Sequence, residues 1–192
     1  MKEPIKRQQI KDRLISSFMG SIEDRVDRYL DIDHQWVING HYFSYASSEC
    51  IDLYRDGYFI AAVMMSHAIN EAIIEFVVSR NPQIVPQDER GETKSLESLV
   101  IELREKNIIS AGCAEASMKI WGSFRADIHH LRPRVAEIDF KNVARENLKR
   151  LAAIEKKIFG VDTLDDGKIK LHNPQYWDLN KDGTVNAFIR LE

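Results

Sequence analysis

The chain has 192 residues, of which 44% are hydrophobic and 30% are charged, and its formal net charge at pH 7 is −3. This composition is that of an ordinary globular protein and argues against a disordered or fibrous chain. A slightly acidic chain has no overall attraction for polyanions, so any binding of nucleic acid must come from a local basic patch. Cys50 and Cys113 have no CxxC spacing, which argues against a disulfide scaffold or a cysteine-based zinc site.

The start of the chain carries no recognisable targeting signal. Met1 to Arg7 lack the apolar core of a signal peptide, and no stretch reaches the roughly 18 uninterrupted apolar residues of a membrane-spanning helix. We therefore expect a cytoplasmic protein with no membrane partner.

The first predicted element is helical. Between Pro4 and Leu30 the apolar residues recur at steps of three or four, which is the period of an amphipathic helix. Ser21 follows Gly20 and precedes Asp24 by three positions, as in a helix cap, so we expect either one long helix or two short ones. We assign residues 1–41 to this N-terminal helical extension.

The central part of the chain predicts an antiparallel helical bundle. After a loop at Asn39-Gly40, helices are expected at Tyr42–Tyr54, Tyr58–Arg80, Ser95–Lys106, Ala111–His130 and Phe140–Phe159. Tyr58–Arg80 should be the central helix, because it is the most apolar segment and its polar residues form only a narrow stripe. Ser95 is expected to cap the helix that follows it. Short connections favour antiparallel neighbours.

The last segment predicts a β-hairpin. Gln175–Leu179 and Thr184–Leu191 flank Asn180-Lys181-Asp182-Gly183, a strong turn sequence between two strand-like runs. The expected fold is all-α, an antiparallel bundle of five or six helices with a small C-terminal β-hairpin. Residues 42–160 form the bundle and residues 161–192 the hairpin tail of a single overall domain.

Two groups of polar residues resemble metal sites without completing one. Asp178 begins a sequence like a calcium loop, but the twelfth position is Ile189, where a bidentate glutamate is needed. His67, Glu71 and Glu75 share a helical face, yet the chain lacks the paired Glu-x-x-His motifs of a di-iron bundle. We expect no metal and no cofactor, and a polar stripe that aligns two helices is the simpler interpretation.

The most informative segment surrounds Arg125. The helical spacing of Met118, Trp121 and Ile128 places Arg125 where the pattern otherwise has an apolar side chain. A guanidinium at such a position needs an anion or a solvent-accessible interface.

A second flank of the same predicted helix carries Asp127 and His130. Asp127 is expected to reach His130, fix its tautomer and raise its basicity, as acid–base chemistry by imidazole requires. Pro133 disfavours helical geometry at Arg132, so the helix should end close to His130 and leave its imidazole accessible.

The same region holds the densest basic cluster of the chain, and such a cluster suits a phosphate. Its members are Lys119, Arg125, His129, His130, Arg132 and Arg134. A purely structural interpretation stays open, in which Arg125 pairs with a carboxylate such as Glu71 and the histidines cap a helix C-terminus.

These residues resemble the signature of the HEPN superfamily, small helical domains named for higher eukaryotes and prokaryotes nucleotide-binding. That signature is an arginine followed after four to six residues by a histidine, late in a helix, and here it reads Arg125 to His130. The segments Tyr54–Val63 and Ser95–Ser110 are similar to the preceding helices of the family. The resemblance spans about Tyr42–Phe159. One subgroup of the family is regulated by nucleotide transfer onto a tyrosine at the position of Arg132, so the arginine found here argues against that form of regulation.

The resemblance implies a metal-independent endoribonuclease that acts as a homodimer, with the two motifs meeting at a symmetric interface. His130 would move protons at the 2′-hydroxyl or the leaving oxygen, and Arg125 would stabilise charge on the phosphoryl oxygens. Asp127 would orient His130, while His129 would bind phosphate or carry the proton itself. Flanking phosphates of the RNA would be bound by Lys119, Arg132 and Arg134. The catalytic residues would be supported from behind by His67 and Glu71.

An enzyme of this kind is expected to be a toxin or defence effector with an antitoxin or defence protein as partner. Two other functional interpretations remain. A noncatalytic helical module would instead use the same interface to bind RNA, a nucleotide or a protein. A purely structural bundle would bind no anion near Arg125.

Overall fold

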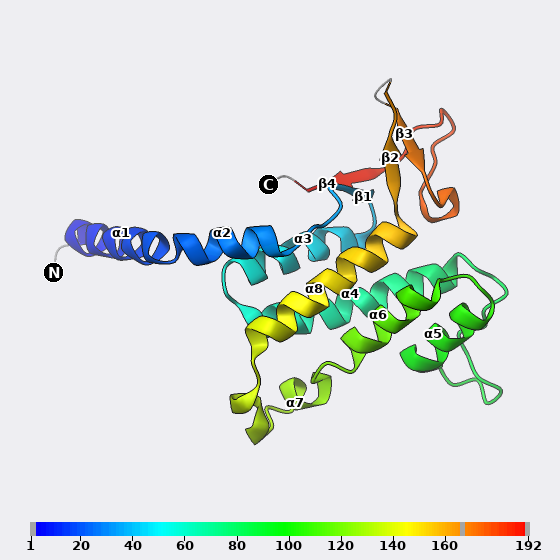
Figure 1. The fold of residues 1–192 in the computed structure, drawn as a ribbon, viewed down its shortest axis with the longest axis horizontal. Coiled ribbons are helices and arrows are strands. Elements are labelled where there is room, and N and C mark those ends of the chain that lie inside the picture. Colours follow the sequence, from blue (N-terminus) through cyan, green and yellow to red (C-terminus); the bar gives the residue numbers. More distant parts are fainter. Residues whose placement is uncertain (1–2, 166–167, 191–192) are drawn as a thin grey trace.

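The structure, a computed structural model, describes residues 3–165 and 168–190 and is mostly helical (Figure 1). The α-helices are α1 (Glu3–Gly20), α2 (Ile22–Asp31), α3 (Tyr42–Arg55), α4 (Phe59–Ser79), α5 (Leu96–Glu105), α6 (Ala111–Trp121), α7 (Arg125–His129) and α8 (Phe140–Ile158). The short strands are β1 (Val37–Asn39), β2 (Val161–Thr163), β3 (Ile169–Leu171) and β4 (Ala187–Ile189), and 3₁₀ helices cover Pro133–Glu137 and Pro174–Tyr176. The predicted fold class, a helical bundle with small β elements, is confirmed.

Helix α4 is the centre of the bundle, as its apolar sequence predicts. It packs against α3, α5, α6 and α8, and Ile73, Ile74 and Val77 on it are fully buried. Its length and composition would also suit a membrane span. The neighbouring helices cover these apolar side chains, so α4 has the surroundings of a core helix.

Three helices of the bundle begin at a side-chain cap. The hydroxyl of Ser95 accepts a hydrogen bond from the backbone N–H of Ser98 at 3.2 Å, which confirms the predicted start of α5. Ser110 caps α6 and Asp139 caps α8 in the same way. Each cap satisfies one of the four N–H groups that a helix N-terminus leaves unpaired.

The prediction of one helix over Ala111–His130 is wrong, because the helix ends at Trp121 and a second, short helix begins at Arg125. Ser123 donates its hydroxyl proton to the carbonyl of Ile120 at 2.6 Å, a bond that competes with helix continuation. Phe124 then adopts a left-handed backbone conformation with φ of 59°. Such a conformation costs a non-glycine residue roughly 1–2 kcal/mol and is concentrated at functional sites. A separate short helix, α7, therefore carries the motif residues.

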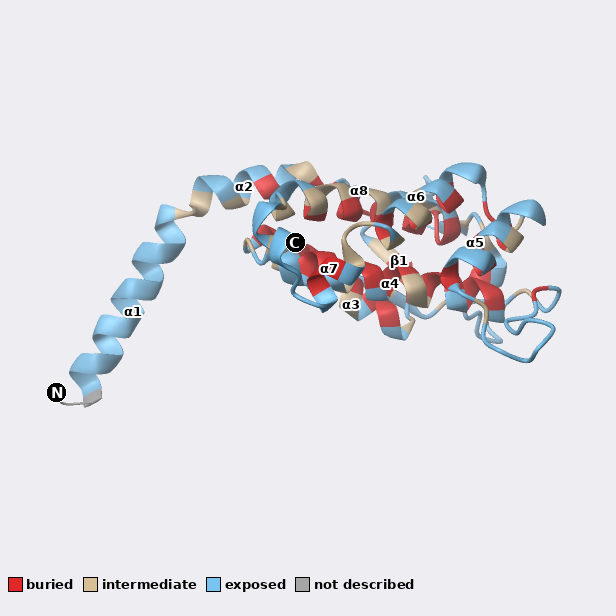
Figure 2. Cartoon of the chain, turned by 90° about the horizontal axis from the view of Figure 1, so that it is seen from below, coloured by how far each residue is buried: buried red, intermediate tan, exposed pale blue. Residues whose placement is uncertain are grey.

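The N-terminal segment forms two helices, one of the two expected alternatives. The break lies at Ser21, but this residue makes no side-chain cap and donates its hydroxyl to carbonyls of the preceding turn. Helix α2 is tied to the bundle, since Arg28 is buried and donates to the carbonyl of Arg55 at 2.7 Å. Helix α1 instead extends away from the body of the molecule with its side chains exposed (Figure 2).

The C-terminal hairpin prediction is only partly correct. The turn at Asn180–Gly183 forms, with Asn180 donating to the carbonyl of Thr184 at 2.8 Å and a bridge between Leu179 and Val185. Beyond that bridge the chain turns to another partner, and β4 pairs antiparallel with β1. Leu191 lies outside the described residues.

Two further features near the C-terminus differ from the sequence prediction. The unpredicted strands β2 and β3 form their own antiparallel pair. The strand β1, at Val37–Asn39, falls in the segment predicted as a helical extension and contains the first residue of the expected Asn39-Gly40 loop. Both strand pairs lie at the C-terminal end of α8, whereas α7 lies near its N-terminal end (Figure 1).

Candidate functional site

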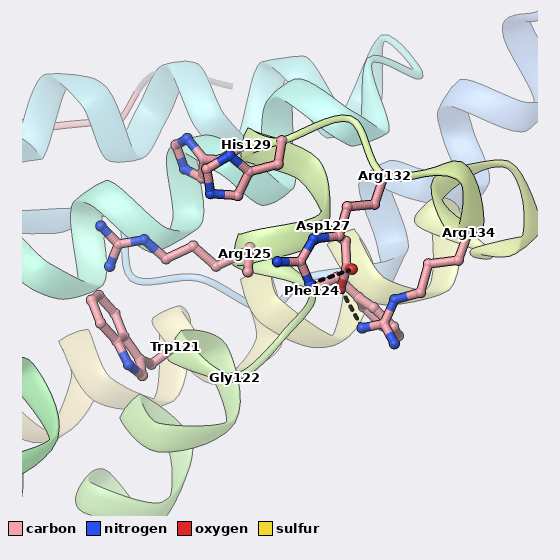
Figure 3. Close-up of a pocket in the computed structure, with 10 residues that line it drawn as sticks. Trp121, Gly122, Phe124, Arg125, Asp127, His129, Arg132 and Arg134 are labelled. Carbon is pink, nitrogen blue, oxygen red and sulfur yellow. Dashed lines mark hydrogen bonds and ion pairs between the residues drawn. The ribbon is translucent and has the colours of Figure 1, made fainter.

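An open depression of about 750 Å³ lies over α7 and the turns on either side of it (Figure 3). It is lined by Trp121, Gly122, Phe124, Arg125, Ala126, Asp127, His129, His130, Arg132 and Arg134. The break after α6 brings these residues together, because it turns α7 so that one short helix and its flanking loops form a single surface. All four residues proposed for catalysis are among them.

Arg125 is held by contacts from two helices. Its guanidinium carbon lies 3.8 Å from the centre of the Trp121 ring, and its Nη2 lies 3.4 Å from Oε2 of Glu71 on α4. The side chain is still 33% exposed. Its Nη1 is buried and has no hydrogen-bond partner among the described residues. The ion pair of the structural interpretation is therefore present, and N–H donors remain free for an anion.

Two exposed imidazoles share this depression with Arg125. His129 lies one helical turn after Arg125 on α7, and His130 follows at the end of the helix. Neither side chain forms a hydrogen bond or ion pair with any residue that the structure describes. The ring nitrogen atoms of both residues are thus available to a bound molecule.

Asp127 does not orient His130, which corrects the sequence prediction. Its carboxylate is buried, with 2% exposed, and accepts a hydrogen bond from Arg134 (Figure 3). Nη1 of Arg132 lies 3.8 Å from its other oxygen. The Arg134 guanidinium lowers the pKa of Asp127, with Arg132 as a smaller cause. Asp127 therefore anchors the turn from α7 into the 3₁₀ helix, and the two arginines keep exposed side chains at the rim.

His67 lies behind the depression in a hydrogen-bond network that fixes its tautomer. Its Nε2 is 2.9 Å from Oγ of Ser123, and Nδ2 of Asn147 donates to the same oxygen at 2.7 Å. Because the Ser123 hydroxyl gives its single proton to Ile120, it accepts from His67, and Nε2 carries the imidazole proton. Nδ1 of His67 is therefore an acceptor, and it is buried without a partner in the described structure.

The charge state of His67 follows from its surroundings. The ring is 2% exposed. Burial lowers its pKa from 6.5 to about 4, and the positive charge of Arg125 contributes in the same direction. His67 is consequently neutral and supports the site through hydrogen bonds rather than charge.

Asn147 is a site residue that the sequence prediction does not include. It is fully buried on α8 and also donates to Oγ of Ser66 at 3.0 Å. A signal was present, because Asn147 lies directly before Leu148 and one turn before Leu151 on the apolar face of α8. A polar residue at a core position needs a hydrogen-bond partner, and here one partner is the hydroxyl of Ser123 at the helix break.

Lys119 is the one predicted phosphate contact that does not line the depression. Its ammonium group lies 2.6 Å from Oε1 of Glu115 on the exposed side of α6. The positive charge of the site therefore comes from Arg125, Arg132 and Arg134, partly balanced by Asp127.

Residues 3–165 and 168–190 contain no group of three or more histidine, cysteine, aspartate or glutamate residues placed to hold a metal ion. Comparison with known proteins gives no match to a protein-family model, a curated protein or a solved structure. An arginine with free donors beside two free imidazoles can bind a phosphate and transfer protons at it.

Proposed function

We propose that the protein is a metal-independent endoribonuclease whose site is formed by Arg125, His129 and His130. The observation that carries this proposal is the presence of a partly exposed guanidinium and two unpartnered imidazoles in one depression. Cleavage of RNA through its own 2′-hydroxyl needs a base, an acid and a stabiliser of phosphoryl charge. These three side chains can supply all three roles without a metal ion.

The reaction divides into one proton removal and one proton delivery. One imidazole takes the proton of the 2′-hydroxyl, and the 2′-oxygen bonds to phosphorus while the bond to the 5′-oxygen breaks. The other imidazole, protonated, gives its proton to that leaving oxygen. Arg125 stabilises the charge on the phosphoryl oxygens through paired N–H donors. The products are a 2′,3′-cyclic phosphate and a 5′-hydroxyl.

The assignment of the two histidines is open to a direct comparison. His130 stands at the position that the resemblance to HEPN domains gives to the proton carrier. His129 lies on the same side of α7 as Arg125, one turn away, and lines a second pocket together with it. We propose that both take part, with His130 as the carrier whose loss is most severe.

The substrate and the assembly complete the proposal. RNA is required because only RNA has the 2′-hydroxyl nucleophile. Arg132 and Arg134, with half-exposed to exposed side chains at the rim, are placed to contact flanking phosphates. The proposed active form is a homodimer, and a role as a toxin or defence effector with a partner protein follows from the same resemblance.

The test is cleavage of a single-stranded RNA in the presence of EDTA, with a DNA of the same sequence as control. We expect cyclic phosphate ends on the RNA products and intact DNA. His130→Ala should lower the rate by about 10²- to 10⁴-fold. Arg125→Lys keeps the positive charge but should cleave RNA much more slowly than the wild type, because the planar guanidinium fork is lost. His172→Ala changes a histidine far along the chain, paired with Asp162, and should be fully active.

Two outcomes would contradict the proposal. RNA that is bound but never cleaved would favour the noncatalytic module. Full metal-free activity in both His129→Ala and His130→Ala would remove the imidazoles from the mechanism. Loss of activity in His129→Ala alone would instead move the proton carrier by one residue.

A further inference from the structure

A second pocket of about 450 Å³ adjoins the depression on the side of α4. Its apolar wall includes Met64, Met65 and Ala68 from one face of α4. Its polar wall includes His67, Glu71 and Arg125. An apolar shelf with a few convergent polar groups is the usual form of a small-molecule subsite.

Arg125 and His129 line both the depression and this pocket. Figure 3 shows the Arg125 side chain directed away from Arg132 and Arg134. A nucleotide whose phosphate contacts Arg125 therefore has its sugar and base within reach of the second pocket. Depression and pocket share these two lining residues, an arrangement that suits successive parts of one RNA strand.

Two buried nitrogen atoms on this wall have no partner in the part of the chain that the structure describes. They are Nδ1 of His67 and Nη1 of Arg125. Leaving a buried polar atom unpaired is unfavourable, so both atoms point to a ligand. The Ser123 network makes His67 Nδ1 an acceptor, while Arg125 Nη1 is a donor.

Glu71 adds a second acceptor to the same wall. Its carboxylate is 37% exposed, and within residues 3–165 and 168–190 its one ion-pair contact is to Arg125 at 3.4 Å. A carboxylate has about four acceptor positions, so most of its capacity is available to a ligand. The pocket thus offers one donor beside two acceptors.

We propose that this pocket binds a nucleobase of the RNA substrate and that it prefers guanine. Among the RNA bases, guanine presents a carbonyl acceptor next to two kinds of N–H donor on one edge. The carbonyl matches Arg125 Nη1, and the N–H groups match Glu71 and His67 Nδ1. The methionines provide a soft apolar face for the ring. This base site rests on the proposed ribonuclease function, of which it would set the sequence preference.

The test is calorimetric titration of the intact protein with the four nucleoside 3′-monophosphates and with inorganic phosphate. These ligands share the phosphate, and none has a bond for the enzyme to cleave. We expect the guanosine nucleotide to bind about tenfold tighter than the uridine nucleotide, since a good bidentate contact discriminates by about that factor. Glu71→Gln should remove the preference. Glu75→Gln, an exposed carboxylate one turn further along α4, should keep it.

A second variant separates the base from the phosphate. Ala68→Leu narrows the pocket and should weaken all four nucleotides while leaving inorganic phosphate unaffected. Equal binding of the four nucleotides by the wild type, or a guanine preference that survives Glu71→Gln, would overturn the proposal. Nucleotide binding by a monomeric Met64→Glu variant but not by a dimeric wild type would also overturn it, because a second copy would then cover the pocket.

The titration and the cleavage assay fail independently. RNA cleavage without any base preference in binding would support the proposed ribonuclease function and contradict the proposed guanine site. Preferential binding of the guanosine nucleotide without RNA cleavage would do the reverse.

Discussion

The guanidinium of Arg125 and the indole of Trp121 are stacked across a helix break, with 3.8 Å between the guanidinium carbon and the ring centre. Trp121 is the last residue of α6 and Arg125 is the first residue of α7. The attraction between a guanidinium and an aromatic face is worth about 0.5–2 kcal/mol, more where water is excluded. Together with Glu71, this contact sets the direction of Arg125 without using all of its donors.

Replacing Trp121 should therefore impair the site without removing a charged group. Trp121→Leu should lower RNA cleavage by about 2- to 30-fold, the factor that corresponds to the loss of a cation–π contact. Trp121→Phe keeps an aromatic face and should recover most of the rate. Equal loss of activity in the two variants, at equal melting temperatures, would show that stacking does not orient Arg125.

The sequence predicted the bundle well, because helical periodicity and caps are local signals. The apolar run of α4 and the cap at Ser95 both appear where their patterns place them. The pairing of β4 with β1 had no local signal, since its two strands lie near opposite ends of the chain. The tail after Gly183 therefore read as half of a hairpin, although its partner is Val37–Asn39.

The site was predictable in its membership but not in its contacts. A helical interpretation of Ala111–His130 placed Asp127 beside His130, but the Asp127 carboxylate is buried and accepts a hydrogen bond from Arg134 instead. Arg134 lies seven residues from Asp127 and reaches it only because Pro133 starts a 3₁₀ turn. The contact between Arg125 and Glu71 was expected from the sequence and is present in the structure. It joins two helices, and the break before Arg125 does not remove it.

Acidification should destabilise the protein through His67. Its pKa is about 4 in the folded protein against an ordinary 6.5, so between these values the unfolded chain binds a proton that the folded chain does not. The free energy of unfolding should rise with pH across this window and then level off, by up to about 3 kcal/mol for this group. Urea unfolding at several pH values measures it.

The control for this pH dependence is a variant that lacks the His67 imidazole. His67→Gln can still donate to Ser123 but does not titrate, and it should flatten the curve across the window. Equal slopes in the wild type and in His67→Gln would assign the pH dependence to other groups.

A buried ion pair should hold the C-terminal strand segment to the bundle. Both nitrogen atoms of the Arg190 fork lie 2.9 Å from the carboxylate oxygens of Glu155 on α8, and both side chains are at most 3% exposed. Arg190→Ala should lower the free energy of unfolding by about 3–5 kcal/mol, because it leaves a buried carboxylate unpaired.

Two comparisons separate this pair from ordinary surface charge. Replacing both residues, as Glu155→Leu with Arg190→Leu, should cost much less than Arg190→Ala alone, since no charge is left buried. Lys156→Ala breaks the neighbouring exposed pair with Asp33 and should cost at most about 1 kcal/mol. A loss in Arg190→Ala no larger than in Lys156→Ala would contradict the assignment.

The exposed apolar side chains of α1 predict self-association. Leu14 is 65% exposed and Ile10 is 50% exposed, and the helix extends away from the rest of the chain (Figure 2). An isolated helix of this length is only marginally stable in water, so it needs a surface to pack against. In the proposed homodimer a second copy provides that surface.

Light scattering at micromolar concentration should give about twice the monomer mass of 22.2 kDa. The double variant Ile10→Glu with Leu14→Glu should shift the mass to that of the monomer, because two charges would have to be buried at the interface. Gln9→Glu introduces a charge at an exposed polar position of the same helix and should leave the dimer intact. A wild-type mass of 22.2 kDa would rule out the dimer. A dimer that withstands the double variant would exclude α1 from the interface, and α7, with its Arg–His motif, would become the surface to change next.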